Sequence, residues 1–315
     1  MSFFSKIYKI CNKFVRHTGW YRDRLFGGAM KFWFFRQFGT EVANLGSGAA
    51  LHAFSYEGVS AKGANWALGP QSLVHDFNIL KNFFSYMKED GYVIITVCPF
   101  SGLFSKYDKF HNFKYYSFLH PATIIDFDDD ERTMALKLKS NPFKELPFMC
   151  LKQVLKEGLI KLKRLVCKRR NVDLSRSAVS IMAGWKNQFG IQDLSAPISS
   201  QHTAEIESRR QTLEDIICFC KERNLHPVIV VPVMHYSLLA FFTEDFKKQY
   251  MDSLLSGLDA PVLNYMYDDM SNKDDSFTTA LFLNKKGSLE FTSKVINDIE
   301  KIKMLSRIPF YDKKV

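Results

Sequence analysis

Apolar residues occur along the chain in short runs, separated by longer segments with helical spacing. Two of the runs, 92–97 and 227–231, have the composition of strands that are buried on both faces. The shorter runs 42–45 and 261–263 are also expected to be strands, and 65–68 is a further short apolar run. Four longer segments place apolar residues three and four positions apart, as amphipathic helices do: 71–88, 203–223, 243–255 and 287–302. This alternation predicts an α/β fold, a three-layer sandwich with a mostly parallel central sheet of the flavodoxin-like kind. In such sheets the binding sites lie at the carboxyl ends of the strands.

The alternation breaks down in the middle of the chain. Residues from about 105 to 200 are irregular and aromatic, with a basic helix expected at 151–166 and a polar, poorly periodic stretch at 186–200. Because so long a connection seldom lacks a role of its own, we expect an insertion at about 105–200. The chain then consists of a basic amphipathic N-terminal arm, 1–36, and a single α/β domain, 37–310, that carries the insertion.

The formal net charge of +10 is concentrated in two segments. Residues 1–36 contain eight basic residues and one acidic residue, and residues 150–176 contain nine basic and two acidic residues. Each segment therefore carries +7, and the remainder of the chain carries −4. The basicity indicates an anionic partner for two local segments rather than for the whole molecule.

Both basic segments contain a predicted amphipathic helix. Apolar residues recur at helical spacing in 3–15 and in 151–166, with lysines and arginines between them. Two interpretations stay open: residues 1–16 and 151–170 bind an anionic membrane surface, or these helices pack their apolar stripes on the core. Nucleic acid is not an expected partner, because the chain has no zinc-finger spacing, RNA-recognition signature or helix-turn-helix pattern.

The cysteines and the N-terminus bear on the compartment. None of the six cysteines forms a pair with CxxC spacing, so we expect reduced thiols, with neither a disulfide framework nor a metal site. No window approaches the ~18 uninterrupted apolar residues of a membrane span, and no secretory signal pattern is present. No glycine-rich nucleotide motif occurs, so no cofactor is expected. These features favour a cytoplasmic protein, with a peripheral position at the inner membrane face as a further option.

Several motifs near the expected strand ends resemble a known family. They are Asn44-Leu45-Gly46-Ser47-Gly48, then Gly63-x-Asn65-x-Ala67-x-x-x-Gln71 with Asp76 and Ile79-Leu80-Lys81, and finally Phe277 with Leu283-Asn284-Lys285-Lys286-Gly287. Together they resemble the SGNH (GDSL-type) hydrolases, most of all the branch found in bacterial capsule and exopolysaccharide gene clusters. The resemblance covers both ends of the chain and leaves the middle unmatched. It implies an SGNH-like fold and a role in surface-polysaccharide synthesis.

The catalytic triad of that family falls on unsuitable residues in this chain. The resemblance places the serine nucleophile at Gly48, the aspartate at Thr279 and the histidine at Phe282. Acyl transfer by this route needs a hydroxyl, a carboxylate and an imidazole, and none of the three positions supplies its group. The family's oxyanion asparagine also lacks a clear counterpart in 98–101. We therefore expect a family member without the family's reaction.

The sequence leaves three functions open. The first is a catalytically degenerate scaffold or binding protein, whose partner is a carbohydrate or another protein of polysaccharide synthesis. The second is an active carbohydrate O-acyl esterase or O-acetyltransferase that uses Ser47, with His52 or His235 as the base and Asp274 or Asp275 nearby. The third is a membrane-peripheral adaptor in which the fold is incidental. The residues expected to line the cleft at the strand ends are Gly46, Ser47, Gly48, Asn65, Gln71, Cys98, Ser101, Phe282 and Asn284.

Overall fold

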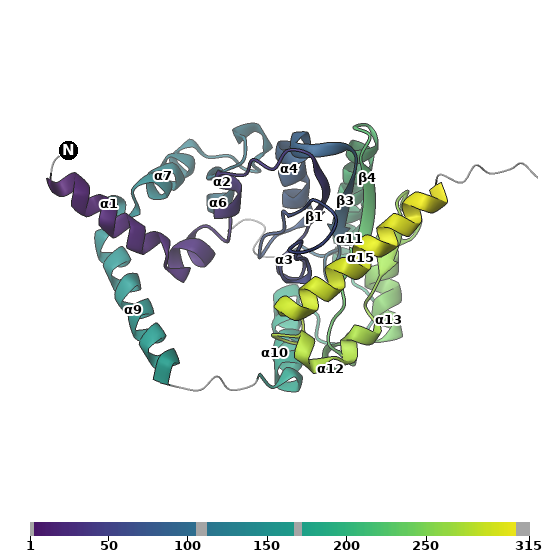
Figure 1. The fold of residues 1–315 in the computed structure, drawn as a ribbon. Helices are drawn as coiled ribbons and strands as arrows, with labels where there is room; N and C mark the ends of the chain where they lie inside the picture. The colour runs from purple at the N-terminus through teal and green to yellow at the C-terminus, as the bar shows by residue number, and fades with distance from the viewer. Residues whose placement is uncertain (1–2, 105–111, 167–171, 307–315) are drawn as a thin grey trace, which may run out of the picture.

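Figure 1 shows the computed structural model of the chain, in which residues 3–104, 112–166 and 172–306 are described. Its centre is a five-stranded sheet with the order β2-β1-β3-β4-β5, in which every neighbouring pair is parallel. The strands are β1 Thr40–Leu45, β2 Gly63–Asn65, β3 Met87–Thr96, β4 His226–Val231 and β5 Val262–Asn264. The predicted α/β fold is confirmed, and the strand order is that of the flavodoxin-like doubly wound folds.

Alternate residues of the strands enter two separate cores. Val93 and Ile95 of β3 belong to the larger core, which includes residues of α4 (Leu73–Phe83) and α11 (Ser200–Lys221). Ile94 belongs to the smaller core, where it joins Phe291 of α15 (Lys285–Ser306). In Figure 1, α15 crosses in front of the sheet, whereas α4 and α11 lie behind it. Because successive strand side chains point to opposite faces, a continuous apolar run buries both faces at once.

Of the other helices in the described residues, α1, α7, α9 and α10 are long and the rest are short. The other α-helices are α1 Phe3–Arg16, α2 Met30–Trp33, α3 Gly48–Ala53, α6 Asn112–Tyr116, α7 Asp129–Ser140, α8 Pro142–Glu145, α9 Pro147–Val166, α10 Leu174–Phe189, α12 Tyr236–Leu239, α13 Glu244–Phe246 and α14 Ser253–Leu255. The π-helical turns are Trp20–Leu25 and Lys247–Asp252, and the 3₁₀ turns are Phe84–Tyr86, Pro121–Thr123, Asp269–Asn272 and Asp274–Ser276. None of the helices within the described ranges is both long enough and apolar enough to cross a membrane.

In three segments the structure differs from the sequence prediction by more than the end residues of an element. The helix expected at 71–88 ends at Phe83, and its last two residues belong to β3 because Met87 pairs with β1. The helix expected at 243–255 is interrupted in its middle by a π-helical turn. The first residues of the stretch 186–200 complete α10, which ends where Gly190 adopts a left-handed conformation with φ of 70°.

The segment 1–36, expected as a basic arm, consists of two different parts. Its first part, α1, lies along α8 and α9. Its second part contributes Tyr21, Phe26 and Phe32 to the larger core, where the rings of Tyr21 and Phe26 meet edge to face at 5.0 Å. Residues 20–33 therefore contribute apolar side chains to the domain's core.

The expected insertion lies between β3 and β4 and contains α6 to α10. Two stretches of it, 105–111 and 167–171, are outside the described residues, and so is the end of the basic segment 151–170. Its last helix, α10, returns to the sheet and packs against α12. This return brings residues of the insertion to the carboxyl edge of the sheet.

Candidate binding pocket

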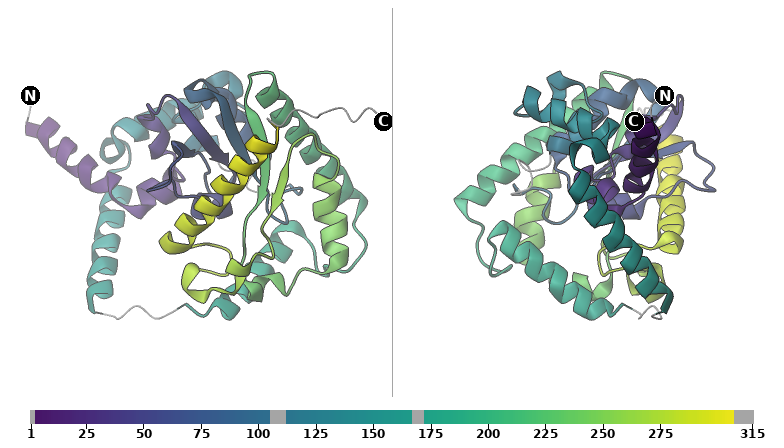
Figure 2. Two further views of the ribbon diagram at one scale, coloured as in Figure 1. Left: turned by 45° about the vertical axis from the view of Figure 1, so that its right-hand side comes forward. Right: turned by 90° about the vertical axis from the view of Figure 1, so that its left-hand side faces the viewer.

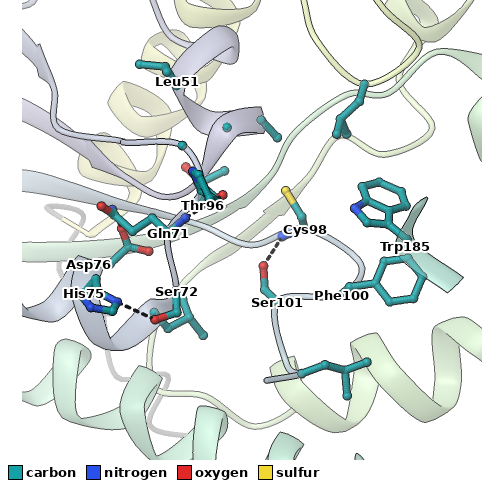
Figure 3. Close-up of a pocket in the computed structure, with 18 of the residues that line it drawn as sticks. Leu51, Gln71, Ser72, His75, Asp76, Thr96, Cys98, Phe100, Ser101 and Trp185 are labelled. Atoms are coloured by element: carbon teal, nitrogen blue, oxygen red, sulfur yellow. Dashed lines mark hydrogen bonds between the residues drawn. The ribbon is translucent and has the colours of Figure 1, made fainter. Parts of the chain in front are cut away.

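A pocket of about 480 Å³ opens at the carboxyl ends of β1, β2 and β3 (Figure 3). The chain leaves β1 toward β2 on one side of it and later returns to β3 on the other side, and such a switch point leaves a crevice between the loops. The loops 46–48, 69–72 and 98–101 meet there, and α10 and residues 281–282 close the remaining sides. The site thus lies at the sheet edge where the sequence predicted it.

The turn after β1 requires glycine at its first position. Gly46 has φ of 132°, and a Cβ there would lie 2.6 Å from the Cβ of Ala50. Only glycine tolerates both the conformation and the contact. The next residue, Ser47, precedes the first turn of α3, and its hydroxyl accepts a hydrogen bond from the backbone N–H of Gln71 (3.2 Å).

The carboxyl group of Asp76, on α4, joins the first two loops of the pocket. It accepts hydrogen bonds from the backbone N–H of Gly46 (2.8 Å) and from the side-chain amide of Gln71. The Gln71 amide nitrogen also donates to the backbone carbonyl of Gly46 (3.2 Å). The hydroxyl of Tyr115 donates to the side-chain oxygen Oε1 of Gln71 (3.2 Å). Asp76 is 2% exposed, and this burial raises its pKa to about 7.

Two lysines hold the loop after β2 from its other side. The ammonium of Lys31 donates to the carbonyl of Ala67, and that of Lys114 donates to the carbonyl of Pro70, which follows a cis peptide bond. Burial lowers the pKa of each lysine to about 7, with a further lowering of the Lys31 pKa by the nearby charge of Lys114. Neither lysine lines the pocket itself.

The positions that the resemblance assigned to the nucleophile and the base lie side by side. A Cβ built on Gly48 would be 3.4 Å from Cζ of Phe282, although the two residues are far apart in the sequence. The Phe282 ring also stacks on His52, with ring centroids 4.5 Å apart. Thr279, at the aspartate position, accepts the backbone N–H of Phe282 through its hydroxyl (3.1 Å). The three positions therefore meet, and the residues in them cannot form a triad.

The two histidines considered as alternative bases are placed differently. His52 lines the pocket, and partial burial lowers the pKa of its imidazole. His235 is 1% exposed; its Nε2 lies 2.9 Å from Asp274 and its Nδ1 lies 2.7 Å from the hydroxyl of Ser237. Within the described chain, neither imidazole hydrogen-bonds to Ser47.

Six of the nine residues expected in the cleft line the pocket: Ser47, Gly48, Gln71, Cys98, Ser101 and Phe282. The other three expected residues, Gly46, Asn65 and Asn284, do not line it. Gly46 provides the turn, Asn65 donates to the carbonyls of Leu51 and Phe54, and Asn284 accepts the N–H of Gly287 in the first turn of α15. Among the lining residues, the thiol of Cys98 is buried, which raises its pKa to about 12 and keeps it protonated.

Sequence reasoning missed the aromatic side of the pocket. Phe100 is stacked on Phe189, with ring centroids 5.1 Å apart, and its centroid lies 5.0 Å from that of Trp185. All three residues line the cavity. Figure 3 shows Phe100 and Trp185 on one side and the polar cluster of Gln71, Asp76 and Thr96 on the other. The four-residue spacing of Trp185 and Phe189 was the available signal, and it lay in the stretch without a family match.

Among the described residues, no lysine or arginine lines the pocket. Its titratable lining residues in that part of the chain are His52, His75, Asp76, Cys98 and Tyr115. The described lining therefore offers no lysine or arginine to pair with a phosphate or carboxylate ligand. The lining suits an uncharged ligand with both apolar and hydroxyl surfaces.

Comparison with known proteins does not identify a relative. No protein-family model matches the chain. No curated protein matches it significantly. The resemblance to SGNH hydrolases accordingly stays a prediction from the motifs quoted above.

The raised pKa of Asp76 predicts that the free energy of unfolding depends on pH. The variant Asp76→Asn should lack this dependence. Between about pH 4 and pH 7 the unfolded chain loses this proton and the folded chain keeps it, so the free energy of unfolding falls as pH rises. A shift of about 3 pKa units corresponds to a loss on the order of 4 kcal/mol. Urea unfolding of both proteins across this range measures it, and a pH-independent difference between them would contradict the prediction.

Proposed function

We propose that this chain binds an uncharged glycan in the pocket at the carboxyl edge of the sheet and does not hydrolyse it. The observation that carries the proposal is the position of Phe282, whose ring lies against Gly48 and stacks on His52. The far edge of a phenyl ring extends about as far from the backbone as Nε2 of an imidazole, so Phe282 occupies the place of the catalytic base. It offers a stacking surface there and no proton acceptor.

The chemistry of the lining supports a sugar as the ligand class. Sugar rings have apolar faces that pack on aromatic side chains and hydroxyl edges that form hydrogen bonds. The pocket supplies Phe100 and Trp185 for the first and Gln71 for the second. Thr96 also lines the pocket, although its hydroxyl oxygen is buried and does not reach the cavity surface.

The resemblance to the polysaccharide-cluster branch supports the biological setting. A protein with this fold that has lost its triad retains a cleft shaped for a glycan substrate. We accordingly propose a glycan-binding or scaffold role in bacterial surface-polysaccharide synthesis, in which the chain holds a glycan for a partner enzyme. Fold alone never assigns such a role, and the argument depends on the pocket residues.

Trp185 gives the first test of the proposal. Isothermal titration of the full chain with uncharged N-acetylated and O-acetylated mono- and disaccharides should detect binding, and the 1-phosphates of the same sugars should bind more weakly. Trp185→Ala should raise the dissociation constant at least roughly tenfold, equivalent to about 1.4 kcal/mol, because a stacking surface is lost.

Phe38→Ala is the matched control, since Phe38 is an exposed aromatic side chain outside the pocket. It should leave the dissociation constant unchanged. A preference for the phosphorylated sugars, or an equal loss of affinity in both variants, would refute the assignment of an uncharged ligand to this pocket.

Ser47 gives the second test, which separates binding from catalysis. Wild type and Ser47→Ala should hydrolyse p-nitrophenyl acetate at the same slow background rate, because the Ser47 hydroxyl has no imidazole partner in the described chain. Release of p-nitrophenol, followed spectrophotometrically, measures this. A rate in the wild type at least tenfold above that of Ser47→Ala would support the esterase or acetyltransferase instead.

A further inference from the structure

Helices α1 and α9 each expose an apolar stripe on one side of the molecule. On α9 the stripe consists of Phe148, Leu151, Leu155, Leu159 and Leu162, of which Phe148 is 88% and Leu159 68% exposed. On α1 it consists of Ile7, Ile10 and Phe14, and Phe14 is 62% exposed. The right-hand view of Figure 2 shows both helices at the front, on the side of the molecule turned toward the viewer.

The stripes are directed away from the protein body. At 3.6 residues per turn the five α9 residues fall within an arc of about 80°. The roughly opposite side of α9 carries Cys150, which is buried, and Glu157, which accepts the backbone N–H of Trp20 (3.1 Å). On α1, the buried residues Asn12 and Val15 likewise lie on the other side from the exposed stripe. Of the apolar residues that the sequence places on these helices, Val15 and Val154 pack on the larger core, whereas Phe14, Leu155 and Leu159 are exposed.

Positive charge borders both stripes. Lys152 and Lys156 follow one edge of the α9 stripe, and Lys9 and Lys13 follow one edge of the α1 stripe; all four are exposed. Helix α1 contains no acidic residue, and the acidic residue of α9, Glu157, lies on the packed side. The exposed surfaces of the two helices thus combine apolar side chains with cations alone.

We propose that α1 and α9 together dock the protein on an anionic lipid bilayer, with both helices lying in the plane of the interface. Apolar stripes bordered by lysines are the arrangement of interfacial helices, in which the stripe enters the acyl region and the cations remain at the headgroups. Because one short apolar stripe alone gives weak membrane binding, we expect both helices to be needed for stable binding.

The charge pattern also selects the bilayer over a second copy of the chain. In a symmetric dimer the same surface is present on both partners, so the lysine borders of one copy would face those of the other. Repulsion between them would oppose the apolar contact. An anionic surface removes this conflict because each lysine meets a negative charge.

Sedimentation of the full-length chain with vesicles tests the proposal. The probes are vesicles of phosphatidylcholine with about 30% phosphatidylglycerol, and vesicles of phosphatidylcholine alone. The chain should bind the anionic vesicles at least tenfold more tightly than the neutral ones, and added salt should weaken the binding. Leu155→Gln with Leu159→Gln, and separately Lys152→Glu with Lys156→Glu, should each lower the affinity at least tenfold. All four side chains are exposed, so circular dichroism should show an unchanged fold.

Two matched controls have equivalent changes elsewhere on the surface. Val179→Gln with Met304→Gln removes exposed apolar side chains of α10 and α15, and Lys221→Glu with Lys248→Glu reverses two exposed lysines. Neither should alter vesicle binding. Equal binding to both vesicle types, or unchanged binding of the leucine variant, would overturn the proposal. The proposal would also be overturned if the wild type formed a dimer that does not bind vesicles and the leucine variant were a monomer. None of these outcomes affects the sugar titration of the pocket.

Discussion

The pocket depends on one buried interaction, the acceptance of two hydrogen bonds by the carboxyl group of Asp76. It holds the backbone of Gly46, after β1, and the side chain of Gln71, after β2, in one place. Burying a carboxyl group is costly, and the raised pKa expresses that cost. Gly46 contributes the complementary constraint, because a side chain there would collide with α3 and move the turn. Asp76 and Gly46 together fix the positions of Ser47, Gly48 and Gln71 in the pocket wall.

The same convergence of loops brings together two residues that are far apart in the sequence. Gly48 and Phe282 come from opposite ends of the chain and meet at the sheet edge, as a nucleophile and its base would. The pocket therefore has a phenyl ring at the position where the resemblance expects an imidazole. Its lining contains no lysine or arginine in the described chain, whereas cations border the exposed stripes of α1 and α9.

Much of the fold followed from the sequence because buried strands have a distinctive pattern. The runs 92–97 and 227–231 were recognisable as strands because their alternate residues fill two cores. The loops that follow parallel strands lie at the carboxyl edge of the sheet, so these loops could be placed together. The extension of β3 back to Met87 depends on pairing with β1, which no local pattern contains. Trp185 and Phe189 were missed for a related reason, because only tertiary structure returns α10 to the pocket. Helical spacing at Leu155 and Leu159 predicted an apolar stripe but not which way it faces.

Rebuilding the triad tests the central claim most directly. The claim is that Gly48, Thr279 and Phe282 lie where the serine, aspartate and histidine of a catalytic triad would lie, and that only the side chains are unsuitable. A chain with Gly48→Ser, Thr279→Asp and Phe282→His should react with a serine-directed fluorophosphonate, and mass spectrometry should locate the adduct at position 48. The wild type, and the rebuilt chain without Phe282→His, should remain unlabelled. Labelling of the wild type at Ser47, or equal labelling with and without the histidine, would contradict the account.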